Sequence, residues 1–140
     1  MATTTIALKN AAVVINSTVD LSDQVQSVTL TVGYDQLETT AFGDTGHKFT
    51  QGLQSVEVTL TLFNSYGAGE IEATLYSVVG AGNTTLVLSP SGTSETASNP
   101  EYTITNAFLA SFTPISATVG ELSEVEVTFV GGTFVRDITP

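Results

Sequence analysis

Apolar and polar residues alternate along three segments of this chain, residues 27–32, 56–62 and 124–129. Successive side chains of a strand point to opposite faces, so a period of two predicts strands with one dry face and one wet face. The wet positions hold mostly threonine and glutamate, including Glu57, Glu124 and Glu126. The pattern therefore predicts a sheet that packs on a core with one face and presents an acidic surface with the other.

Other segments complete a mainly β chain. Residues 67–80 are expected to contain the helix, because Ile71, Leu75, Val78 and Val79 form one apolar stripe and Gly80 is placed to end it. A single capped turn is expected at residues 20–23, with Asp20 as the N-cap. Further strands are expected at residues 11–16, 25–32, 55–63, 84–88, 101–112 and 121–130. The sequence thus predicts one domain over residues 1–140, an antiparallel β-sandwich with one flanking helix.

A connection of 20 residues, 33–52, separates two of the predicted strands. Ordinary hairpin loops have about 2 to 5 residues, so this one is expected to be a long loop. It carries large side chains, which either pack over the chain's own core or contact another molecule. The flanking glycines favour the intermolecular alternative, because they would let the loop swing outward. The candidate residues are Tyr34, Leu37, Phe42, Asp44, His47 and Phe49.

Charge narrows the possible partners. The net charge is -11, with 14 acidic residues against only three lysines and arginines. Such a surface repels phosphate backbones and argues against nucleic-acid binding. The absence of cysteine excludes disulfides and thiolate metal sites. The N-terminus lacks the features of a signal peptide and no apolar run could span a bilayer, so we expect a soluble protein without a membrane partner.

No catalytic arrangement emerges from the sequence. His47 is the only histidine, and the chain has neither a cysteine nor a G-x-S-x-G nucleophile motif. The acids at 20 and 23, or at 35, 38 and 44, lack calcium-loop spacing, and residues 43–46 lack the lysine of a phosphate loop. We therefore expect a structural protein, with no enzymatic activity, no metal and no cofactor. The acidic face has two interpretations, a solvated exterior or the lining of a channel, and the pattern leaves both open.

Several short blocks, in order, resemble the tail tube (major tail) proteins of long-tailed bacteriophages. The resemblance covers residues 20 to 136. Its blocks are Asp-Leu-Ser-Asp-Gln-Val at 20–25, Ala-Phe-Gly-Asp-Thr at 41–45, Gly-Leu-Gln-Ser at 52–55, Asn-Pro-Glu-Tyr at 99–102, Ala-Ser-Phe-Thr-Pro at 110–114, Val-Gly-Glu-Leu at 119–122 and Gly-Gly at 131–132.

The resemblance implies hexameric rings that stack into a tube. Strands of neighbouring subunits would close into a ring-shaped β-barrel around a lumen, through which double-stranded DNA passes without specific binding. Six copies at -11 each give about -66 per ring, and like charge would keep the phosphate backbone from adhering. The residues expected to face the lumen are Glu57, Glu124, Glu126, Thr29, Thr31, Thr59, Thr61 and Thr128.

The resemblance also implies contacts between copies. The loop at 33–52 would contact adjacent subunits and the next ring, and residues 1–10 and 131–140 would be arms. Its partners would be itself and other tail proteins, and its location the virion, after assembly in the cytoplasm of a bacterial host. A capsid decoration protein, or another virion protein with the same sandwich, is the main alternative. A glycan-binding module is disfavoured, because the chain has no tryptophan to stack on sugars.

Overall fold

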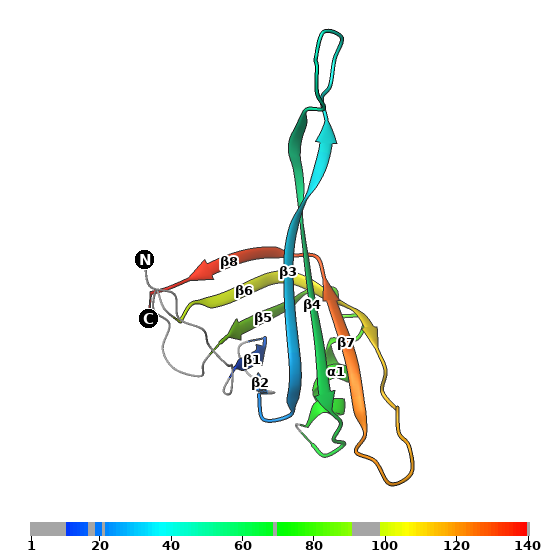
Figure 1. Ribbon diagram of the computed structural model, residues 1–140. Helices are drawn as coiled ribbons and strands as arrows, with labels where there is room; N and C mark the ends of the chain where they lie inside the picture. The colour runs from blue at the N-terminus through cyan, green and yellow to red at the C-terminus, as the bar shows by residue number, and fades with distance from the viewer. Residues whose placement is uncertain (1–10, 17–18, 21, 69, 91–98, 140) are drawn as a thin grey trace, which may run out of the picture.

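The computed structural model describes residues 11–16, 19–20, 22–68, 70–90 and 99–139, and all pairings between the described strands are antiparallel. The strands follow the order β2-β1-β5-β6-β7-β4-β3, with β8 beside β6 (Figure 1). Their bounds are β1 (Ala12–Ile15), β2 (Val19–Asp20), β3 (Val25–Glu38), β4 (Phe49–Phe63), β5 (Thr84–Ser89), β6 (Glu101–Phe112), β7 (Glu124–Val130) and β8 (Thr133–Asp137), with the helix α1 at Ile71–Val78. The prediction of a mainly β, antiparallel fold with one helix is confirmed for the described residues.

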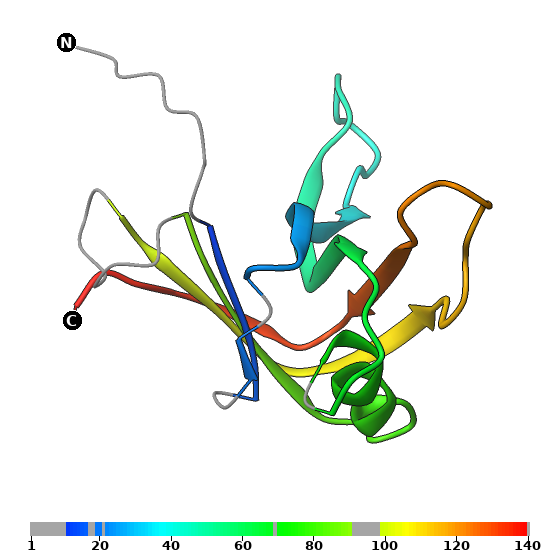
Figure 2. The ribbon, with the colours of Figure 1, turned by 90° about the horizontal axis from the view of Figure 1, so that it is seen from below.

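The sheet folds into two layers because β6 belongs to both (Figure 2). The first half of β6 pairs with β5 and β8, and its second half pairs with β7. The second connection between the layers is the passage from β7 to β8 through Gly131 and Gly132, and both glycines have a positive φ. The core lies between the layers and is formed by Val13, Ile15, Val56, Val58, Leu60, Leu62, Ile71, Leu75, Val78, Leu86, Leu88, Ile104, Ala107, Val125, Val127 and Phe129.

The helix forms where the apolar stripe predicted it. Ile71, Leu75 and Val78 are buried, and Gly80, with φ of +75°, ends the segment. Val79 departs from the predicted stripe and is half exposed, because the helix ends at Val78 and Val79 has extended backbone angles. Among the described residues, no helix is long and apolar enough to cross a membrane.

The prediction of a long loop at 33–52 is wrong. β3 and β4 continue through this stretch as a hairpin, with pairing out to Glu38 and Phe49, so that only residues 39–48 form its tip. Backbone pairing needs no alternation of apolar side chains, and therefore the hydrophobic pattern did not reveal it. The hairpin projects far beyond the two layers (Figure 1).

The capped turn predicted at 20–23 is a turn between strands rather than a helical one. The Asp20 carboxylate accepts hydrogen bonds from the backbone N–H of Ser22, at 2.9 Å, and from the Ser22 hydroxyl. The Ser22 Oγ in turn accepts a hydrogen bond from the N–H of Val13, at 2.9 Å. The side-chain contacts of Asp20 thus fix the approach to β3 against β1.

The segments expected to be arms differ in what the structure describes. Residues 1–10 lie outside the described part of the chain. In the C-terminal segment, β8 pairs with β6 of its own chain, from Glu101 opposite Asp137 to Thr105 opposite Thr133. A contact of either segment with a neighbouring subunit stays a prediction.

Candidate assembly surfaces

One face of the layer β3-β4-β7 gathers the residues expected to face a lumen. Directly opposed residues of antiparallel strands share a face, and Thr29, Thr59 and Thr128 form one such row across all three strands. In the next row Thr61 is opposite Glu126. All three positions of the central row are exposed or half-buried, while the alternate positions of β4 and β7 lie in the core.

The same register places the remaining predicted residues. Thr31 is opposite Glu57, and Glu124 is opposite Phe63 at the end of the layer. Since residues two apart on a strand share a face, all eight predicted positions lie together on it. Among the described residues of these rows there is no lysine or arginine, so the face is acidic and otherwise neutral. We call it the acidic face.

Sequence reasoning missed two further members of the acidic face, Ser111 and Phe108 on β6. Ser111 is opposite Thr128, and Phe108, half exposed, is opposite Val130. A register shift between Leu109 and Ser111 breaks the alternation of β6 at this point. The strand also passes from one layer to the other, so no single period could assign its faces.

The hairpin carries apolar side chains on both of its sides. Leu37 is paired with Thr50, and Phe49 with Glu38 in the next pair, so Leu37 and Phe49 point to opposite sides. They are 51% and 58% exposed, and Phe42 at the tip is fully exposed. The contact of residues 33–52 with another molecule stays a prediction.

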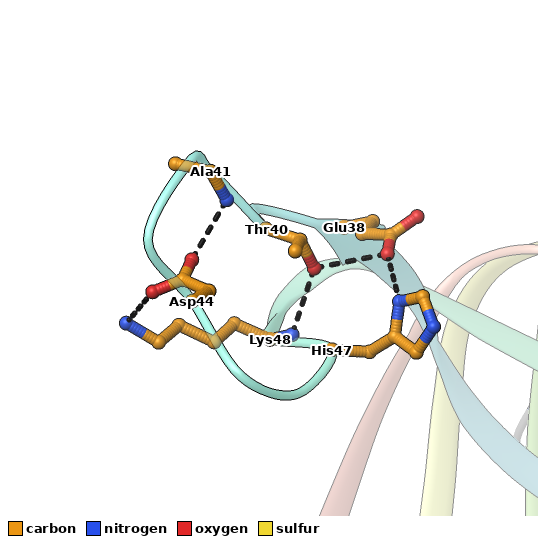
Figure 3. Close-up of polar contacts among 6 residues, drawn as sticks. All are labelled: Glu38, Thr40, Ala41, Asp44, His47 and Lys48. Atoms are coloured by element: carbon orange, nitrogen blue, oxygen red, sulfur yellow. Dashed lines mark hydrogen bonds and ion pairs between the residues drawn. The ribbon is translucent and has the colours of Figure 1, made fainter.

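Polar contacts shape the tip of the hairpin (Figure 3). The Glu38 carboxylate lies 2.6 Å from Nδ1 of His47 and accepts a hydrogen bond from the Thr40 hydroxyl at 2.9 Å. The Thr40 Oγ1 accepts a hydrogen bond from the backbone N–H of Lys48. The contact with His47, and then that with Thr40, lower the pKa of Glu38 below its ordinary value.

A second carboxylate, that of Asp44, contacts residues on both sides of the turn (Figure 3). It lies 2.7 Å from the Lys48 ammonium and accepts a hydrogen bond of 2.7 Å from the backbone N–H of Ala41. These two contacts, the first larger, lower the pKa of Asp44. The predicted contact residues Asp44 and His47 therefore hold the conformation of the tip, whereas Phe42 is left as its free apolar surface.

These carboxylates have no arrangement suited to a metal. Glu38 and Asp44 face His47 and Lys48 rather than each other. Within the described ranges, no group of three His, Asp or Glu side chains could hold an ion. The chemistry available at these surfaces is charge repulsion and apolar contact.

The base of the hairpin is tied to the second layer. The Gln54 side chain donates a hydrogen bond to the Tyr34 hydroxyl, and its oxygen accepts one from the backbone N–H of Phe134 on β8. Tyr34, predicted as a contact residue, is half exposed at this junction. These hydrogen bonds anchor the base of the hairpin, while its outer part exposes apolar side chains.

The fold of this chain is similar to that of chains from tail tube assemblies. A chain of the cryo-EM structure of the PVC sheath–tube complex, from an extracellular contractile injection system in its extended state, superposes with a TM-score of 0.70. It is 15% identical over 96% of this chain and 93% of that one. The SPP1 tail tube superposes with a TM-score of 0.71 and 10% identity, over 93% of this chain and 77% of that one.

A chain of the PVC sheath/tube terminator is similar as well, with a TM-score of 0.73 and 16% identity over 98% of this chain and 99% of that one. Identities this low show a shared fold alone. No protein-family model and no curated protein matches the sequence. The predicted resemblance to tail tube proteins is confirmed at the level of the fold.

Proposed function

We propose that this chain is a structural, non-enzymatic subunit of a phage-type tail tube, in which hexameric rings stack around a lumen lined by the acidic face. The observation that carries the proposal is the gathering of Glu57, Glu124 and Glu126 on one threonine-rich face, in a fold shared with the SPP1 tail tube. Double-stranded DNA would pass along this face without binding, because the carboxylates repel its phosphates.

Two free strand edges support closure into a ring-shaped barrel. Among the described strands, β3 pairs only with β4, and the second half of β6 pairs only with β7. Unpaired edges expose backbone N–H and C=O groups that another strand can satisfy. Pairing of β3 in one subunit with β6 of the next would use both edges and continue the acidic face around the ring.

The proposal extends to partners and location. Subunits of such a tube would contact other tail proteins at its ends, in a virion assembled in the bacterial cytoplasm. The similar structures are of a sheath–tube complex, a sheath/tube terminator and a tail tube.

Charge reversal tests the lumen directly. We expect assembled tubes carrying Glu57→Lys, Glu124→Lys and Glu126→Lys to retain linear double-stranded DNA in a form protected from nuclease, because the lining would then attract phosphates. A matched variant with Glu70→Lys and Glu72→Lys beside and on α1, and Asp137→Lys on β8, has the same change in net charge at positions outside the β3-β4-β7 layer. DNA held by this control is expected to be digested.

The readout is the amount of DNA that survives nuclease in sedimented tubes. Equal digestion with both variants would place the acidic face on the outside of the tube. The face would then be a solvated exterior, and the lumen assignment would be wrong.

A further inference from the structure

An open apolar groove separates the two layers beside β3. It has a volume of about 440 Å³ and is lined by Val28, Leu30 and Val32 of β3 on one side and by Leu88, Tyr102 and Phe134 on the other. The rings of Tyr102 and Phe134 stack there, with their centroids 5.5 Å apart. The three β3 side chains are only partly buried, although they belong to the core-facing side of the strand. Within the described part of the chain, the groove is therefore an extension of the core that no other element covers.

The hairpin also exposes apolar side chains. Its tip presents Phe42 fully to solvent, and Leu37 and Phe49 are more than half exposed on opposite sides. A two-stranded ribbon is marginally stable by itself in water, so burial against a partner would stabilise it. The hairpin projects away from the body of its own chain, which carries the groove (Figure 1).

Charge favours a second copy as the partner. Two chains of net charge -11 repel each other over most of their surfaces. None of the residues lining the groove is charged. The charged groups at the tip are Glu38, whose carboxylate contacts His47, and Asp44 and Lys48, which pair with each other. The groove and the tip are thus surfaces where two copies can meet with little repulsion.

We propose that the apolar groove of one subunit receives the hairpin tip of a second copy, with Phe42 as the inserted side chain. The contact joins two different surfaces of identical chains, and such a contact, repeated, builds a ring or an open polymer rather than a closed dimer. This inference rests on the proposed tube and names the receiving surface for its hairpin.

Disulfide trapping tests the contact cleanly, because the natural chain has no cysteine. One preparation carries Ala41→Cys, which keeps the neighbouring Phe42, and another carries Leu30→Cys. The two are mixed as monomers, concentrated to assemble, and oxidised. We expect a disulfide-linked dimer on a non-reducing gel, about tenfold above either variant oxidised alone, since disulfides need Cα atoms within roughly 7 Å. A control mixture replaces Leu30→Cys with Tyr76→Cys, on the exposed side of α1.

The outcomes separate this inference from the tube itself. If the mixture forms tubes in the electron microscope but no dimer above the Tyr76→Cys control, the groove is not the receiving surface, although the tube stands. If Ile6→Cys cross-links to Leu30→Cys and Ala41→Cys does not, the N-terminal segment occupies the groove and our inference is wrong. If no tubes and no dimer form, both the inference and the proposed function are overturned.

Discussion

At the scale of single residues, the turn that joins the two layers is determined by the close approach of two backbone segments rather than by side-chain contacts. Gly132 has a φ of +90°, and a Cβ atom built on it would lie 2.3 Å from the carbonyl oxygen of Thr105 and 3.0 Å from the nitrogen of Ala107. Both neighbours are backbone atoms of β6 and cannot rotate away. Only glycine therefore lets β8 return along β6 after β7 ends.

Replacing this glycine tests the turn. We expect Gly132→Ala to lower the free energy of unfolding by at least about 1 to 2 kcal/mol, because alanine is strained at positive φ and its Cβ would displace β6. The measurement is urea unfolding of the monomer. Gly46→Ala is the control, since its Cβ would meet no atom within 4 Å, and it should change stability by less than about 0.5 kcal/mol. Equal effects of the two substitutions would contradict this account of the turn.

At the scale of elements, the hairpin has a tip held by side-chain hydrogen bonds and an outer part that exposes apolar side chains. Its tip is held by two carboxylates, the exposed Glu38 and the partly buried Asp44, and the pKa of each is lowered. A carboxyl whose pKa is lower in the folded state stabilises that state above its ordinary pKa. This contribution is lost as the pH falls through the lowered value.

The contact of Asp44 with Ala41 should therefore be lost in acid. We expect the amide NMR shift of Ala41, which donates to Asp44, to show an acid step below about pH 4. Asp44→Asn keeps an acceptor oxygen and removes the charge, so this acid step should vanish in that variant. An acid step of the Ala41 signal that persists in the Asp44→Asn variant would contradict the role given to Asp44.

Removing the tip separates folding from assembly. Deletion of residues 41–48 should leave the monomer's thermal unfolding close to that of the full chain, because no core residue lies in this stretch. Polymerisation should be lost, since Phe42 would be absent. Light scattering at high concentration measures the second effect, and tubes formed by the deletion variant would move the contact between copies elsewhere.

How much of the structure the sequence reveals differs between elements. The alternation in β4 and β7 predicts both their core faces and the acidic face, because each has one side on a core. The outer parts of β3 and β4 have no core to pack on. There, Leu37 and Phe49 point to opposite sides of the hairpin, so the apolar side chains follow no single strand period. Neither the register of three strands nor the bulge in β6 is encoded in a local pattern, and Ser111 and Phe108 were missed for that reason.

The whole molecule combines three surface features. They are the acidic face, two strand edges that pair with no described strand, and apolar side chains exposed both on the hairpin and in the groove. A net charge of -11 opposes self-association at low ionic strength. Salt screens this repulsion and leaves apolar contact intact. The chain is therefore expected to assemble more readily as salt and protein concentration rise.

Negative-stain electron microscopy of the purified protein, at high concentration and about 0.15 M salt, tests the central claim most directly. We predict hollow tubes built of stacked six-fold rings with an open central channel. Persistent monomers, or trimers that bind only to capsids, would contradict the tube and favour a decoration protein with the acidic face turned to solvent.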